Sequence, residues 1–78
     1  MTLGKRLLAL AEGDQKILPM LSKDVNEHEE WPLLQICLEA AKKGEKEADV
    51  GKCVPPCLEK EEIFFKKDHC NHVIAYWS

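Results

Sequence analysis

The segment Pro32–Gly44, PLLQICLEAAKKG, is the most strongly patterned stretch of this 78-residue chain and decides its architecture. Pro32 suits the first position of a helix, and Gly44 suits the position just after the last turn. Lys42 and Lys43 lie at the end where the helix dipole favours positive charge. The sequence therefore predicts a helix between Pro32 and Gly44.

Apolar residues cover most of the circumference of this helix. Its polar residues form one narrow stripe, which contains Gln35, Glu39, Lys42 and Lys43. The other positions are apolar or small: Leu33, Leu34, Ile36, Cys37, Leu38, Ala40 and Ala41. Such a helix is either the central helix of its domain or meets another protein through part of its surface. We interpret Cys37 as a buried thiol that acts as a small hydrophobic side chain.

Two further helices are expected before this segment. Leu3, Leu7, Leu10 and Ala11 recur at helical spacing, with Thr2 placed to cap the start and Gly13 to end the helix. Asp14 could cap a second helix, but Pro19 would remove a backbone hydrogen bond beyond its first turn. The second helix is therefore either short or begins at Pro19.

Strand-forming residues gather in the last part of the chain. Residues 63–65 and 72–77 are rich in β-branched and aromatic side chains, and they flank a turn-like segment at residues 68–71. This pattern predicts a β-hairpin. An alternative is a fourth helix near residues 57–68, because Pro56 could open it and acidic residues precede Lys66 and Lys67.

The expected fold is thus a small single α+β domain spanning residues 1–78, with an all-α fold as the alternative. Residues 1–44 form its helical part, residues 45–56 an exposed connection rich in charged residues, glycine and proline, and residues 57–78 a hairpin segment bearing cysteine and histidine. A chain this short buries only about 60–65% of the surface that its unfolded form exposes. Domains of this size commonly need a disulfide, a structural metal or a partner.

Five side chains able to bind a metal lie within 20 residues: Cys53, Cys57, His69, Cys70 and His72. Structural zinc is held by four thiolate or imidazole ligands, often as two pairs with short spacing. We therefore predict a zinc site formed by Cys53, Cys57, Cys70 and His72, with His69 as the alternative fourth ligand. A disulfide joining Cys70 to Cys57 or to Cys53 is the competing interpretation, and unpaired thiols are the third.

Composition and motifs narrow the classes of function. The formal charge of −3 argues against a non-specific binder of nucleic acid, which normally carries a basic surplus. The apolar run after Leu7 ends at Glu12, so we expect neither a signal peptide nor a membrane span, and we expect an intracellular protein. No phosphate-binding loop, zinc-protease motif or calcium loop is present, and we expect no enzymatic activity.

These features favour a non-catalytic module that binds and modulates another protein. The candidate contact residues are large and apolar or aromatic: Trp31, Leu34, Leu38, Tyr76 and Trp77. A homodimer formed through the third helix would use the same surplus of apolar residues. The alternative is a winged-helix or helix-turn-helix regulator that binds nucleic acid, although Glu29 and Glu30 before the third helix would repel phosphates.

Overall fold

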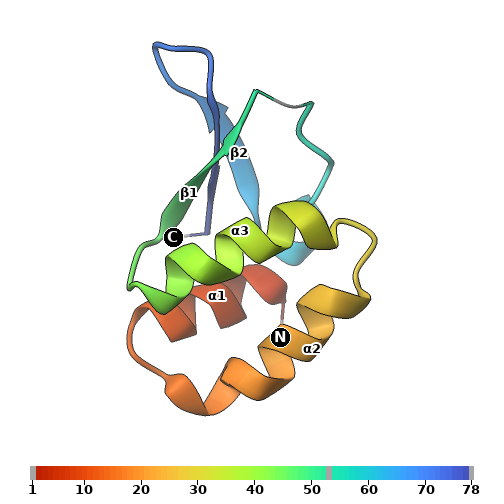
Figure 1. Ribbon diagram of the computed structural model, residues 1–78, viewed down its shortest axis with the longest axis vertical. Coiled ribbons are helices and arrows are strands. Elements are labelled where there is room, and N and C mark those ends of the chain that lie inside the picture. The colour runs from red at the N-terminus through yellow and green to blue at the C-terminus, as the bar shows by residue number, and fades with distance from the viewer. Residues whose placement is uncertain (1, 53, 78) are drawn as a thin grey trace.

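The computed structural model describes residues 2–52 and 54–77 and shows three helices followed by a three-stranded antiparallel sheet. The helices are α1 (Leu3–Ala11), α2 (Leu18–Glu27) and α3 (Trp31–Lys42), and the strands are β1 (Glu47–Gly51), β2 (Phe64–Lys67) and β3 (Val73–Tyr76). The helices lie at one end of the molecule and the strands extend from the other (Figure 1). The α+β prediction is confirmed. The fourth helix considered near residues 57–68 is not formed, because a single 3-10 turn, η2 (Glu59–Glu61), is followed by β2.

The expected helix termini are present. The side chain of Thr2 accepts a hydrogen bond from the backbone N–H of Lys5 at 3.3 Å, which caps the start of α1. Gly13 and Gly44 follow α1 and α3 with positive φ angles of 109° and 85°, a conformation that glycine adopts without steric cost. Asp14 caps a 3-10 turn, η1 (Gln15–Ile17), and α2 then begins at Leu18 with Pro19 in its first turn.

The sheet has the strand order β1-β3-β2, so β3 is its central strand. The hairpin formed by β2 and β3 agrees with the sequence prediction. The segment expected to be an exposed connection, residues 45–56, instead contains β1, which pairs with β3. That expectation was wrong because the charged residues of β1 alternate with Ala48 and Val50, which lie on the side facing the core.

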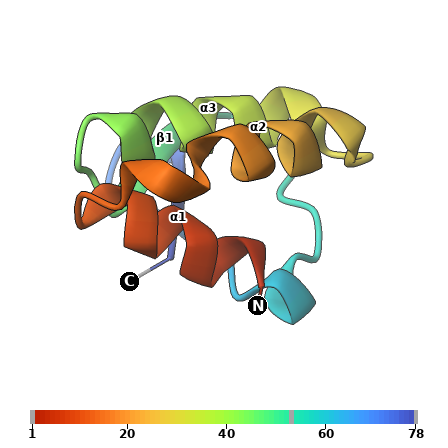
Figure 2. The ribbon, with the colours of Figure 1, turned by 90° about the horizontal axis from the view of Figure 1, so that it is seen from below.

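The core lies where α3 meets α1, α2 and β1. Figure 2 shows α2 and α3 in one layer with α1 crossing beneath them. Leu34, Cys37 and Leu38 of α3 have no exposed surface, so α3 is the central helix of the domain. The interpretation of Cys37 as a buried, hydrophobic thiol is confirmed. Among the described helices, none combines the length and apolar composition needed to cross a membrane.

Candidate functional site

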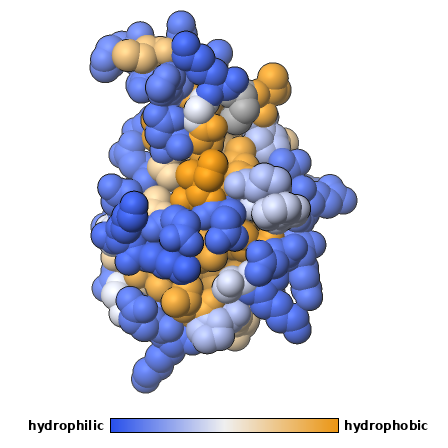
Figure 3. Space-filling view, in the orientation of Figure 1, coloured by the Kyte–Doolittle hydropathy of each residue, from blue (hydrophilic) through white to orange (hydrophobic). Residues whose placement is uncertain are grey.

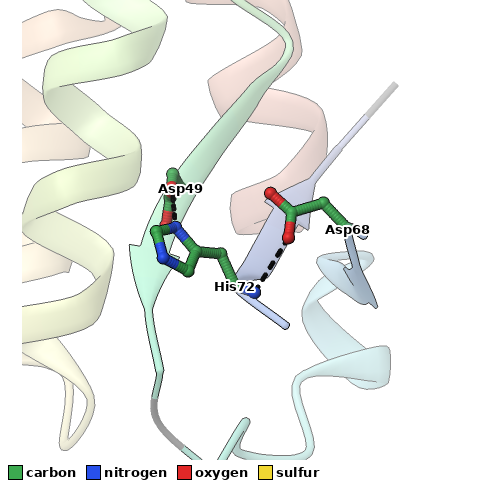
Figure 4. Close-up of side chains that lie close together, drawn as sticks. All are labelled: Asp49, Asp68 and His72. Carbon is green, nitrogen blue, oxygen red and sulfur yellow. Dashed lines mark hydrogen bonds and ion pairs between the residues drawn. The ribbon is translucent and has the colours of Figure 1, made fainter. Parts of the chain in front are cut away.

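Three side chains that can bind a metal converge beside the β2–β3 turn (Figure 4). Asp49 belongs to edge strand β1, Asp68 follows β2, and His72 precedes β3. Nδ1 of His72 lies 2.8 Å from Oδ2 of Asp49. One ligand atom from each of the three residues lies within 4.8 Å of the other two. The group therefore joins β1 to the turn of the hairpin.

The turn itself is built around Asp68. Its Oδ1 atom accepts hydrogen bonds from the backbone N–H groups of Cys70 and His72, both at 2.9 Å. Asn71 has a φ angle of 64°, a left-handed conformation that asparagine tolerates better than most residues. The backbone N–H of Asp68 donates to the carbonyl oxygen of His72 at 3.0 Å and closes the hairpin. These bonds fix the direction in which the His72 side chain leaves the turn.

Asp49 is held by a local bulge. The pairing of β1 with β3 shifts register between Asp49 and Gly51, and Gly51 has a φ angle of 86°. The backbone N–H of Gly51 donates to Oδ1 of Asp49 at 2.7 Å, which leaves Oδ2 facing His72. The hydrogen bond with His72, followed by that from Gly51, lowers the pKa of the Asp49 carboxyl below its ordinary value. Asp49 is therefore a carboxylate at neutral pH.

The chemistry of this group suits a divalent cation. Two carboxylates and one imidazole offer oxygen and nitrogen ligands. Zinc accepts both kinds, whereas magnesium and manganese prefer the oxygen ligands. The side chains of Asp49 and His72 are about half exposed, so water could complete the coordination of an ion. The Asp49–Asp68–His72 group is the one set of three or more such residues that converges within the described part of the chain.

The predicted zinc ligands are only partly brought together. His72 belongs to the converging group, whereas Cys57 and Cys70 are exposed free thiols that are not bonded to each other. His69 is exposed in the turn and also lies outside the group. Cys53 lies outside the described residues, so the four-ligand set stays a prediction. Sequence reasoning missed Asp49 and Asp68 because their approach depends on the pairing of β1 with β3.

The predicted partner-binding residues separate into two groups. Trp31, at the start of α3, is 52% exposed, and Tyr76 is half-buried on the sheet. Leu34 and Leu38 are fully buried, and Trp77 is 4% exposed. The expectation that these three side chains form a contact surface is corrected, because all three are buried in the same hydrophobic core.

One face of the sheet is not covered by the helices. Strand pairing and the alternation of side chains place six residues on it, which we call the outer sheet face: Glu47, Asp49, Phe64, Lys66, Ile74 and Tyr76. The rings of Phe64 and Tyr76 are 5.8 Å apart, and Nζ of Lys66 lies 5.2 Å from the centre of the Tyr76 ring. Lys66 also lies 3.8 Å from Glu47, across β3. The outer sheet face thus carries two aromatic rings bordered by opposite charges.

A groove with a volume of about 450 Å³ begins at this face and follows β2, and we call it the β2 groove. One wall is the segment Pro55–Glu59, and the opposite wall contains Phe64, Phe65 and Tyr76, with Ile63 between the two. In the view of Figure 3, apolar side chains reach the surface in a narrow strip above α3, between hydrophilic side chains. A second groove of about 320 Å³ lies between α3 and β1, and its walls combine charged residues such as Glu39 and Lys43 with apolar residues such as Ile36.

Comparison of the chain with protein-family models, curated proteins and solved structures gives no match. Inference about function therefore depends on the residues of this chain and on their geometry.

Proposed function

We propose that this protein is a non-catalytic interaction module that binds another protein at the β2 groove. The observation that carries the proposal is the composition of the walls: Pro55 and Pro56 face Phe64 and Tyr76 across a groove of about 450 Å³. Phe64 is 40% exposed although it is one of the two phenylalanines in the chain. Solvent-exposed aromatic side chains beside a groove are typical of sites where a partner protein supplies apolar contacts.

Other exposed apolar residues support this choice of surface less well. Met20 and Trp31 are exposed singly on different helices, and an isolated exposed apolar side chain is common on folded proteins. Ile36 lines the groove between α3 and β1, which is the smaller of the two and has no aromatic residue among its described lining residues. Phe64 is an exposed aromatic side chain that lines the larger groove, so it marks the surface on which the proposal rests.

Site-specific photo-crosslinking in cells tests the proposal. A photoreactive benzoylphenylalanine would replace Phe64 in one sample and the exposed Met20 of α2 in a control. We expect a discrete crosslinked protein from position 64 that is absent from position 20. The crosslinked partner, once identified and purified, should bind the unmodified chain in calorimetry. It should bind the Phe64→Ser variant at least tenfold more weakly. Equal crosslinking from both positions would refute the β2 groove as the contact surface, and crosslinks between copies would indicate a homodimer.

A second proposal concerns zinc, and the convergence of Asp49, Asp68 and His72 favours it. Two ligand sets share His72: the sequence-predicted set of Cys53, Cys57 and Cys70, and the set with Asp49 and Asp68. An ion held by the second set would tie β1 to the hairpin turn and stabilise the outer sheet face. It would thus supply part of the stability that a domain of this size lacks.

Cobalt substitution distinguishes the two ligand sets. Thiolate ligands give Co²⁺ an intense charge-transfer absorption in the near ultraviolet, which carboxylate and imidazole ligands do not. If Asp49 and Asp68 are ligands, this band is absent and the Asp68→Asn variant loses affinity for Zn²⁺, whereas Cys57→Ser does not. A strong thiolate band lost in Cys57→Ser would instead support the cysteine set. Native mass spectrometry that finds no zinc on the reduced protein would refute both.

A further inference from the structure

Strand β2 is an open edge of the sheet. The strand order places β3 on one side of β2, and no strand pairs with the other side within the described residues. The opposite edge differs, because β1 packs against α3. In an antiparallel pair, the backbone N–H and C=O groups of every second residue point away from the partner strand. An open edge of this kind can accept a further strand from another chain.

The segment Pro55–Glu59, which forms the other wall of the β2 groove, does not pair with the open edge of β2. It begins with Pro55 and Pro56, and proline has no backbone N–H with which to pair in a sheet. Within the described residues, no backbone hydrogen bond joins residues 54–58 to β2. The β2 groove therefore separates β2 from the segment that runs beside it, and an extended chain could enter between them.

The charges on β2 determine what kind of chain fits. Lys66 and Lys67 are adjacent, so their side chains lie on opposite faces of the strand. Lys66 makes an exposed contact with Glu47 at 3.8 Å, and Lys67 forms no ion pair with any described residue. Lysines on an edge strand repel a second copy of the same edge, which disfavours pairing between two β2 strands. The same lysines attract carboxylates on both faces of an incoming strand.

We propose that β2 binds an extended segment of another protein that carries two adjacent acidic residues and one apolar residue. This inference rests on the proposed function and names the class of partner. In antiparallel pairing the two acidic residues lie opposite Lys67 and Lys66, the next residue lies opposite Phe65, and the apolar residue lies opposite Phe64. The order along the partner is therefore acidic, acidic, any residue, apolar.

The apolar residue and the acidic residue opposite Lys66 lie on the same face, because they are two positions apart. The apolar side chain then packs on Phe64, which stands 5.8 Å from the ring of Tyr76. The acidic side chain competes with Glu47 for Lys66, a contact that is exposed on both sides and therefore weak. Backbone pairing supplies affinity, and the two lysines with Phe64 supply selectivity.

Synthetic peptides of eight residues test this directly on the full chain. The first peptide has the order Asp-Glu-Thr-Phe within a threonine-rich sequence, the second has lysine at both acidic positions, and the third has the order reversed. We expect the first peptide to slow hydrogen exchange at amides of β2 and to bind at least tenfold more tightly than the second. The Lys66→Glu and Lys67→Glu double variant should reverse this preference.

Lys43→Glu serves as the control, because Lys43 lines the other groove. Its replacement changes the net charge by as much as each of the two substitutions on β2. It should leave the preference for the acidic peptide intact. The inference is wrong if the first peptide does not protect β2, if the reversed peptide binds as tightly as the first, or if the protected amides belong to β1 or α3. If crosslinking from position 64 nevertheless yields a specific partner, strand addition fails while the interaction function stands. If crosslinking also fails, both are refuted.

Discussion

Oδ2 of Asp49 and Nδ1 of His72 lie 2.8 Å apart, and this contact joins edge strand β1 to the start of central strand β3. The contact holds the pKa of Asp49 below its ordinary value of about 3.9. A carboxyl whose pKa is lowered by folding adds stability above the unfolded pKa, and that contribution is lost as the pH falls through the folded value.

Replacement of Asp49 by asparagine should therefore have a pH-dependent effect. At neutral pH, Asp49→Asn is expected to lower the free energy of unfolding slightly, because the contact is exposed. The difference from the unmodified protein should begin to shrink as the pH falls below about 4, the unfolded pKa, and should disappear as the pH falls through the lower folded pKa of Asp49. Urea denaturation over a series of pH values measures this difference in the free energy of unfolding, with Glu27→Gln on α2 as a control. A difference that stays constant down to pH 2 would show that the charge of Asp49 plays no part.

The burial of α3 gives a prediction about its two faces. Leu38 is fully buried in the core, whereas Ile36 on the same helix is 43% exposed. We expect Leu38→Ala to lower the free energy of unfolding by about 2–5 kcal/mol, through lost burial and the cavity left behind. Ile36→Ala should cost less than about 1 kcal/mol. Similar costs for both variants in chemical denaturation would mean that Leu38 is not packed as the structure shows.

The helices could be predicted from the sequence because their signals are local. Thr2, Gly13, Pro32 and Gly44 mark termini through the conformations of single residues, and the apolar spacing of α1 and α3 is read within one helix. Strand β1 has no such signal. Its alternation involves only Ala48 and Val50 among charged residues, and its place in the sheet depends on pairing with a segment more than 20 residues away.

For the same reason, His72 is the only residue of the candidate site that could be predicted from the sequence. Asp49 reaches His72 because β1 pairs with β3 in one register, and a shift of one residue would turn Asp49 to the other face. Asp68 looked like an ordinary turn residue, and it does form the turn. Tyr76 and Trp77 are adjacent in an extended segment and therefore point to opposite sides, and Trp77 is the one that joins the core.

The reactivity of the three described cysteines tests whether each thiol is buried or exposed as the structure shows. Burial raises the pKa of Cys37 to about 12, and the thiolate is the reactive form of cysteine. With excess iodoacetamide at pH 8, we expect Cys57 and Cys70 to be alkylated rapidly in the native protein and Cys37 only after denaturation. Peptide mass mapping reports each site separately. Rapid native alkylation of Cys37 would show that α3 opens readily, which its central position in the core contradicts.

Glu61, the last residue of η2, and Glu62, which follows it, hold the first turn of α1. A side-chain oxygen of Glu61 accepts the backbone N–H of Leu3 at 3.3 Å, and one of Glu62 accepts the hydroxyl of Thr2 at 3.1 Å. These carboxylates also lie at the positive end of the helix dipole. Gly4 permits this approach, because a Cβ atom at Gly4 would overlap the backbone carbonyl oxygens of Glu61 and Glu62.

Gly4→Ala should therefore destabilise the protein although alanine favours a helix by about 1 kcal/mol over glycine. The overlap involves backbone atoms that cannot move like a flexible side chain, so we expect a net loss of about 1–3 kcal/mol in chemical denaturation. Lys5→Ala is the control, since the neighbouring Lys5 is exposed and only 3.9 Å from Glu62 in a weak ion pair. If Gly4→Ala instead stabilises the chain, α1 does not pack on Glu61 and Glu62, and helix propensity alone governs this position.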